Sequence, residues 1–208
     1  MSLFYRVAQS SLRAVFRILY DHKVIVKDPT PIIGGAIIAS NHLSFLDPPL
    51  IAASWSEAIA FFAKADLFEN PLLRTLITNL NAHPVGNGND VKSLKLACKL
   101  LEEGNKILIF PEGTRSLDGS LVPFKRGIGM LSLRTKTPII PTYIHGTFDI
   151  WPKGQKLPSL FGKRTVCIFG KPIFPEEFIE KDDTHIVLRV QNEIFNLQQW
   201  YLKEIKQH

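Results

Sequence analysis

The stretch DVKSLKLACKLLEEGNKILIF, residues 90–110, decides the fold class of this 208-residue chain. Asp90 opens a helical pattern as its N-cap, and Gly104 ends the pattern. The apolar residues between them recur at the spacing of one helix face: Val91, Leu94, Cys98 and Leu101. The apolar run Lys106–Phe110 follows at once and has the length of a buried strand. The stretch therefore predicts a helix that leads directly into a strand.

The same alternation of helical patterns and short apolar runs continues along the chain. The other predicted strands are Lys23–Val26, Ala36–Ser40, Ala58–Phe62, Ala82–Val85, Ile139–Ile144 and Arg164–Phe169. A long terminal helix follows Asp182, with a buried side made of Ile186, Val190, Ile194, Leu197 and Tyr201. Strands separated by helices predict an α/β fold, a single domain with a mostly parallel central sheet flanked by helices. In such sheets the chemistry usually lies in the loops after the strands.

Composition and charge exclude several classes of protein. With 45% hydrophobic and 21% charged residues, the chain is neither disordered nor fibrous. Its two cysteines, Cys98 and Cys167, are too few for a cystine scaffold or a Cys-only metal site. The net charge is +6, and between Leu121 and Lys171 nine basic residues face one acidic residue, Asp149. This excess favours a nucleic acid, an anionic bilayer or a phosphorylated metabolite, unless it is only a solvated face.

The N-terminal residues 1–20 predict a basic amphipathic helix, followed by a main domain over residues 21–208. Its apolar residues are Phe4, Ala8, Leu12, Val15, Phe16 and Leu19, and its basic residues are Arg6, Arg13 and Arg17. The apolar stripe could pack on the protein's own core or lie in a lipid interface. The longest stretch without charged residues, Pro29–Leu46, contains two prolines and two glycines, so no transmembrane span is predicted.

The first candidate site follows the strand Ala36–Ser40 and reads NHLSFLDPP, residues 41–49. His42 and Asp47 can meet only if the residues between them form a turn, because five helical steps would separate them. A carboxylate on one ring nitrogen leaves the other free to take a proton from a hydroxyl. Alternatively, Asp47 is an N-cap with Pro48 at the first helical position, and His42 is incidental.

The second candidate site, PEGTRS at residues 111–116, follows the strand Lys106–Phe110. A glycine, two hydroxyls and the fork of Arg115 suit recognition of a phosphate group. Lys125 and Arg126 add positive charge at the start of the next helix. The alternative is a surface loop in which Glu112 pairs with Arg115.

Together these segments resemble the glycerolipid acyltransferase family, the PlsC-like group that includes 1-acylglycerol-3-phosphate O-acyltransferases. The resemblance rests on four segments: N-H-x-S-x-x-D-P at Asn41–Pro48, F-P-E-G-T-R-S at Phe110–Ser116, P-F-K-x-G at Pro123–Gly127, and Thr137–Pro141. It implies that His42 is the general base and that Asp47 orients it. It implies that the substrate is held by Glu112, Gly113, Thr114, Arg115 and Lys125, with Asn41 and Ser44 beside them. Ser44 also suits a turn residue.

The function implied by this resemblance is acylation of lysophosphatidate to phosphatidate. The acyl donor would be acyl-CoA or acyl carrier protein, with no metal or further cofactor. The expected location is the cytoplasmic face of a membrane, as a peripheral or monotopic protein on an anionic surface, with no nucleic acid partner. Three alternatives stay open: acylation of glycerol 3-phosphate or another lysophospholipid, a noncatalytic basic module that binds lipid or nucleic acid, and a hydrolase with Ser44 as nucleophile.

One position departs from the family pattern. The family usually has an arginine just after the strand that here ends at Val85, and this chain has Gly86-Asn87 instead. Lys64, Lys92 and Lys95 are the candidates to supply the missing charge. The departure bears on the identity of the acceptor more than on acyl transfer.

Overall fold

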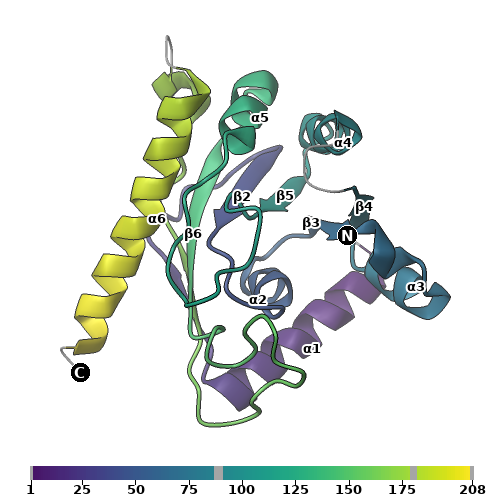
Figure 1. The fold of residues 1–208 in the computed structure, drawn as a ribbon. Helices are drawn as coiled ribbons and strands as arrows, with labels where there is room; N and C mark the ends of the chain where they lie inside the picture. Colours follow the sequence, from purple (N-terminus) through teal and green to yellow (C-terminus); the bar gives the residue numbers. More distant parts are fainter. Residues whose placement is uncertain (1, 87–90, 179–181, 207–208) are drawn as a thin grey trace.

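A single sheet organises the computed structural model, which describes residues 2–86, 91–178 and 182–206. In these residues seven strands pair in the order β1-β7-β6-β2-β5-β3-β4 (Figure 1). The strands are β1 (Lys23–Val26), β2 (Ala36–Ser40), β3 (Ile59–Lys64), β4 (Ala82–Val85), β5 (Lys106–Ile109), β6 (Ile139–His145) and β7 (Val166–Phe169). All neighbours are parallel except β6 and β7, which confirms the predicted, mostly parallel α/β sheet.

Helices cover both faces of this sheet (Figure 1). They are α1 (Leu3–Tyr20), α2 (Asp47–Ser54), α3 (Pro71–Asn79), α4 (Val91–Glu102), α5 (Gly127–Thr135) and α6 (Asp183–Lys206), with 3-10 turns η1 (Ala65–Phe68) and η2 (Pro175–Phe178). The sheet separates two hydrophobic clusters, one containing residues of α1 and α2 and the other residues of α4, α5 and α6. The helices therefore form two layers with the sheet between them.

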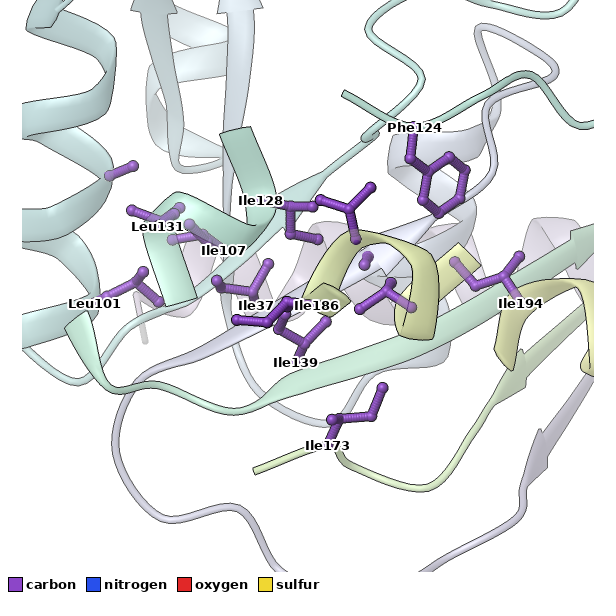
Figure 2. Packing of buried hydrophobic residues seen from close by; sticks show 14 of the residues in the cluster. Ile37, Leu101, Ile107, Phe124, Ile128, Leu131, Ile139, Ile173, Ile186 and Ile194 are labelled. Atoms are coloured by element: carbon purple, nitrogen blue, oxygen red, sulfur yellow. The ribbon is translucent and has the colours of Figure 1, made fainter. Parts of the chain in front are cut away.

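The central strand β2 shows how the sequence produces these layers. All five of its residues are buried, and successive side chains point to opposite faces of a sheet. Ile37 and Ala39 belong to the cluster with α4, α5 and α6, shown in Figure 2, whereas Ala36 and Ile38 pack with α1 and α2. A strand buried on both faces explains why AIIAS is an unbroken run of small and apolar residues.

The predicted elements match the structure closely, with differences at their ends. β3 begins at Ile59 and reaches Lys64, β5 stops at Ile109, and β7 begins only at Val166. Asp90, the predicted N-cap of α4, lies outside the described residues. Gly104 ends that helix as predicted, with a φ of +85° that a glycine adopts without strain.

The N-terminal helix α1 packs on the domain. Phe16 and Tyr20 are buried in the cluster with α2, and Arg13 donates to the carbonyl oxygen of Ala53 at 2.8 Å. Part of the predicted apolar stripe does not pack on the domain, because Phe4 and Val15 remain exposed. Exposed apolar residues of this helix are Leu3, Phe4, Val7, Val15 and Ile18. Within the described residues, every helix is too short or too polar to cross a lipid bilayer.

Candidate active site

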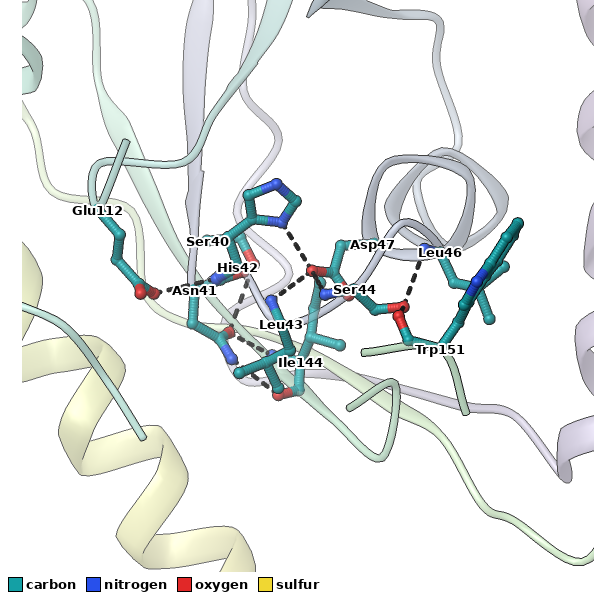
Figure 3. A network of polar contacts seen from close by, with 10 residues as sticks. All are labelled: Ser40, Asn41, His42, Leu43, Ser44, Leu46, Asp47, Glu112, Ile144 and Trp151. Carbon is teal, nitrogen blue, oxygen red and sulfur yellow. Dashed lines mark hydrogen bonds and ion pairs between the residues drawn. The ribbon is translucent and has the colours of Figure 1, made fainter. Parts of the chain in front are cut away.

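Two loops meet at the carboxyl ends of the neighbouring strands β2 and β5 (Figure 3). The backbone N–H of His42 donates to Oε1 of Glu112 at 3.0 Å. In return, the backbone N–H of Ser116 donates to the carbonyl oxygen of His42 at 2.8 Å. Parallel pairing of β2 with β5 brings the two loops to one edge of the sheet. The structure thus joins the two candidate sites into one.

His42 and Asp47 are in direct contact. Nδ1 of His42 lies 2.8 Å from Oδ2 of Asp47, and the same oxygen accepts the backbone N–H groups of Leu43 and Ser44 at 2.6 and 2.7 Å (Figure 3). The intervening residues therefore form the turn that the contact requires. The N-cap alternative for Asp47 is wrong: Leu46 is the N-cap of α2, Asp47 is the first helical residue, and its carboxylate faces back into the loop.

The imidazole of His42 is held on its face as well as at Nδ1. The ring of Phe110 stacks on it, with ring centroids 3.8 Å apart and an interplanar angle of 11°. The side chain of His42 is 19% exposed, whereas that of Asp47 is fully buried. A proton on Nδ1, facing the carboxylate, leaves the lone pair of Nε2 available to accept another proton. This arrangement suits a general base.

Glu112 is a buried carboxylate beside the same histidine. Burial raises the pKa of Glu112 to about 7, although the hydrogen bond from the backbone of His42 opposes the rise. The negative charge of Asp47 adds to the upward shift. The alternative in which Glu112 pairs with Arg115 does not hold, because its Oε1 accepts from His42 and its Oε2 has no partner among the described residues. Glu112 therefore stabilises the histidine loop.

Two basic side chains lie at the second loop, Lys125 against Gly113 and Arg115 on the ring of Phe45. Gly113 has a φ of +69°, and a Cβ there would collide with the end of the Lys125 side chain. Lys125 thus lies across this glycine. The guanidinium carbon of Arg115 lies 3.5 Å from the ring centroid of Phe45, and Thr114 is exposed. Burial lowers the pKa of Arg115, while the charge of Asp47 raises it.

Unpartnered polar atoms are concentrated at this site. Among the described residues, five buried side-chain nitrogen or oxygen atoms have no hydrogen bond partner. Three of the five belong to the site: Asp47 Oδ1, Glu112 Oε2 and Arg115 Nη1. Buried polar groups in a folded protein are normally paired, so such a concentration is typical of a place where a ligand binds.

Asn41 and Ser44 lie in the site but face the protein framework. The side-chain amide of Asn41 exchanges two hydrogen bonds with the backbone of Ile144, at 2.8 and 3.0 Å. The hydroxyl of Ser44 donates to the carbonyl oxygen of Trp151 at 2.8 Å, and both side chains are buried. Their polar groups are thus used to hold the loop. A nucleophilic role for Ser44 gains no support, because its hydroxyl is directed to Trp151.

The structure also shows contacts that the sequence analysis missed. Phe45 and Phe110 each stack on a charged or titratable side chain of the opposite loop. Both aromatic residues lie within the segments that resemble the family, and this position is the signal in the sequence that could have identified them. Arg126 is directed away from the loop and pairs with Asp183 on α6 at 2.6 Å.

The structure describes only part of the region after β4 where the chain departs from the family pattern. Lys64, one candidate for the missing charge, ends β3 at the same edge of the sheet as the site. Lys92 and Lys95 are exposed on α4, and Asn87 lies outside the described residues. No group of three or more His, Cys, Asp or Glu side chains that could hold a metal ion occurs in the described ranges.

Comparisons with known proteins agree with this geometry. A family model described as Acyltransferase matches residues 22–145. A solved structure, that of the 1-acyl-sn-glycerophosphate acyltransferase PlsC from Thermotoga maritima, superposes with a TM-score of 0.80 at 27% sequence identity. The superposition covers 98% of this chain and 80% of that chain.

Curated relatives carry the same kind of name. A 1-acyl-sn-glycerol-3-phosphate acyltransferase from Bacillus subtilis is 29% identical over 177 residues, which cover 84% of each chain. A chloroplastic one from Brassica napus is 33% identical over 141 residues, which are 66% of this chain and 40% of the relative. The chain thus spans most of the bacterial relative but less than half of the plant one.

Proposed function

The chain belongs to the Acyltransferase family, and from this membership we propose that it transfers an acyl group to the free hydroxyl of 1-acyl-sn-glycerol 3-phosphate. The observation that carries the proposal is the His42–Asp47 pair, which lies in one site with the loop that contains Arg115. The names of the Bacillus and Thermotoga proteins, which align over most of this chain, support lysophosphatidate as the acceptor. Acylation of this acceptor yields phosphatidate.

In the proposed reaction His42 acts as the general base. Its Nε2 takes the proton of the acceptor hydroxyl while the hydroxyl oxygen forms a bond to the carbonyl carbon of an acyl thioester. The carbon–sulfur bond then breaks, and the imidazolium returns its proton to the departing thiolate. The Asp47 carboxylate, 2.8 Å from Nδ1, stabilises the imidazolium between the two proton transfers.

Arg115 and Lys125 would bind the phosphate of the acceptor. The unpartnered Nη1 of Arg115 and the ammonium of Lys125 beside Gly113 are donors that suit phosphate oxygens. Gly113 and Thr114 would add contacts from the same loop. We assign Asn41, Ser44 and Glu112 to support of the loop rather than to direct binding.

The donor and the membrane are part of the same proposal. Acyl-CoA and acyl carrier protein are both acidic and suit the net charge of +6. The acceptor is a lipid, so the enzyme would work at the cytoplasmic face of a membrane as a peripheral or monotopic protein. The exposed apolar residues of α1, together with Arg6 and Arg17, suit an anionic lipid interface, whereas Arg13 donates to the domain itself.

The test supplies purified protein with labelled acyl-CoA and either lysophosphatidate or glycerol 3-phosphate. His42→Ala should reduce kcat by about 10²- to 10⁴-fold, the usual contribution of a general base. Arg115→Ala should mainly raise KM for the phosphate acceptor, by roughly tenfold or more. His185→Ala and Arg189→Ala on the exposed side of α6 are matched controls and should behave as wild type.

Distinct results would support the other functions. If the protein acylates glycerol 3-phosphate in preference to lysophosphatidate, glycerol 3-phosphate is the acceptor. A folded His42→Ala protein with unchanged acyl transfer would contradict the assigned base. Lipid or nucleic acid binding by a wild-type protein without acyl transfer would favour the noncatalytic module.

A further inference from the structure

The two site loops exchange aromatic contacts. Phe110, which precedes the second loop, stacks on His42 of the first, and Phe45 of the first loop stacks on Arg115 of the second. The first contact explains the orientation of the base. The second contact involves a residue to which the sequence motifs assign no role.

Arg115 is held by this ring rather than by an acidic side chain. Among the described residues it forms no ion pair or side-chain hydrogen bond, and its guanidinium carbon lies 3.5 Å from the centroid of Phe45. Stacking uses the flat face of a guanidinium and leaves the N–H donors at its edge available. A carboxylate partner would occupy those donors and compete with an anionic ligand. An aromatic partner therefore orients the arginine without neutralising it.

Phe45 is itself fixed from two directions. Its ring packs against Trp151 with centroids 5.3 Å apart and an interplanar angle of 50°. The preceding residue, Ser44, donates to the carbonyl oxygen of Trp151 at 2.8 Å and accepts the backbone N–H of Leu46 at 3.1 Å. Hydrogen bonds on both sides of Phe45 thus restrain its backbone, although its side chain is 50% exposed. A restrained ring can define the plane of a guanidinium stacked on it.

We propose that Phe45 is a positioning residue that presents the edge of the Arg115 guanidinium to the phosphate monoester of the acceptor. The inference rests on the proposed function, because it concerns the same site, and it adds a residue that determines affinity for the charged acceptor. It predicts that an aromatic ring, rather than apolar bulk, is what position 45 requires. It also predicts an effect on acceptor binding and not on proton transfer at His42.

The test compares Phe45→Leu, Phe45→Trp and Phe195→Leu. Phe195 on α6 is 49% exposed and thus matches Phe45 in residue type and exposure, on a helix outside the two site loops. Phe45→Leu should raise KM for lysophosphatidate by about three- to tenfold, with KM for acyl-CoA and kcat within about twofold of wild type. Phe45→Trp should keep KM for lysophosphatidate close to the wild-type value, and Phe195→Leu should leave it unchanged. An equal loss in both position-45 variants, or a fall in kcat alone, would overturn the proposal.

A double-mutant cycle isolates the stacked pair. If Phe45 acts through Arg115, adding Phe45→Leu to Arg115→Ala should not raise KM further. The same increase in both backgrounds would show that Phe45 acts by itself, for example as an apolar contact to the acyl chain, and would contradict the proposal.

A binding measurement separates this inference from the proposed function. Calorimetry with a short-chain, monomeric lysophosphatidate requires no turnover, and Phe45→Leu should weaken its Kd by the same factor as KM. If wild type binds this probe but transfers no acyl group, the proposed function fails and the binding of the variants still decides the role of Phe45. Absence of binding to wild type would overturn the role of Phe45 directly.

Discussion

The carboxylate of Asp47 holds the imidazole of His42 and the loop that carries it through a single oxygen. Oδ2 accepts from Nδ1 of His42 at 2.8 Å and from the backbone N–H groups of Leu43 and Ser44 at 2.6 and 2.7 Å. The conformation of the loop and the orientation of the base are therefore coupled. The two roles can be separated by substitutions that remove different properties of the carboxylate.

Asp47→Asn should reduce kcat strongly while the protein remains folded. An amide oxygen can still accept the backbone N–H groups, but it lacks the negative charge that stabilises the imidazolium, and we expect a loss of roughly 10²-fold or more. Asp47→Ala leaves both backbone groups unpaired in a buried site and should also lower the free energy of unfolding by about 1–3 kcal/mol. Steady-state kinetics and urea denaturation measure the two effects. Equal kcat in wild type and Asp47→Asn would contradict the role of the charge.

Glu112 should make wild type less stable as the pH rises. Its pKa is about 7 in the folded protein against 4.5 in the unfolded chain, so between these values the folded state holds a proton that the unfolded state has released. The free energy of unfolding therefore falls by on the order of 1–3 kcal/mol as the pH rises from about 4.5 to above 7. In Glu112→Gln this position no longer titrates, so its contribution to the pH dependence of the free energy of unfolding is absent. The amide oxygen still accepts the N–H of His42.

Urea denaturation of wild type and Glu112→Gln at pH 5 and pH 8 tests this expectation. Subtracting the free energy of unfolding of one protein from that of the other at each pH cancels the contribution of other titrating groups. Parallel pH dependences would show that Glu112 does not titrate as described.

The fold was largely predictable because its signals are local. β2 is buried on both faces, so AIIAS reads as a strand without alternation, and the spacing of Val190 and Ile194 specifies the buried side of α6. No comparable local signal in the sequence predicts that β6 and β7 pair antiparallel. That pairing follows from the path of the residues between the two strands.

The candidate site was predictable in its residues but not in its contacts. The motifs contain His42, Asp47 and Arg115, whereas the stacking of Phe45 on Arg115 depends on how β2 and β5 bring two distant loops together. The N-cap interpretation of Asp47 failed for a related reason. A carboxylate before two prolines suits an N-cap, but here the backbone N–H groups of the preceding loop are nearer partners.

Membrane association should depend on the exposed apolar residues at the start of α1. Phe4 and Val7 are exposed there beside Arg6, so their replacement by serine should remove favourable transfer into the interface. We expect the double variant Phe4→Ser/Val7→Ser to bind anionic phosphatidylglycerol vesicles roughly 30-fold more weakly in a flotation assay, since each side chain contributes about 1 kcal/mol and every 1.4 kcal/mol is tenfold in affinity. Leu188→Ser/Phe195→Ser on α6 is the matched control. An equal loss in both double variants would contradict a specific role of α1.

His22 should make the protein acid-sensitive. Burial lowers its pKa to about 4, and its ring nitrogens contact the hydroxyls of Thr165 and Ser54 at 2.9 and 2.8 Å. Between pH 6.5 and 4 the unfolded chain binds a proton that the folded protein does not, so stability is lost as the pH falls, on the order of 2 kcal/mol. His22→Gln should show a smaller loss than wild type between pH 7 and pH 4 in urea denaturation. Identical acid sensitivity in the two proteins would exclude His22 as the cause.

Two glycines of the same helix, α5, should respond oppositely to alanine. A Cβ on Gly129 would overlap the backbone carbonyl of Asp183, where α6 begins, whereas a Cβ on Gly127 meets no heavy atom within 4 Å. Gly129→Ala must therefore displace α6 from α5, and we expect it to lower the free energy of unfolding by about 1–3 kcal/mol. Gly127→Ala gains helix propensity and should be neutral or stabilising, by at most about 1 kcal/mol. Urea denaturation of both variants measures the difference, and equal stabilities would show that the two helices are not packed at Gly129.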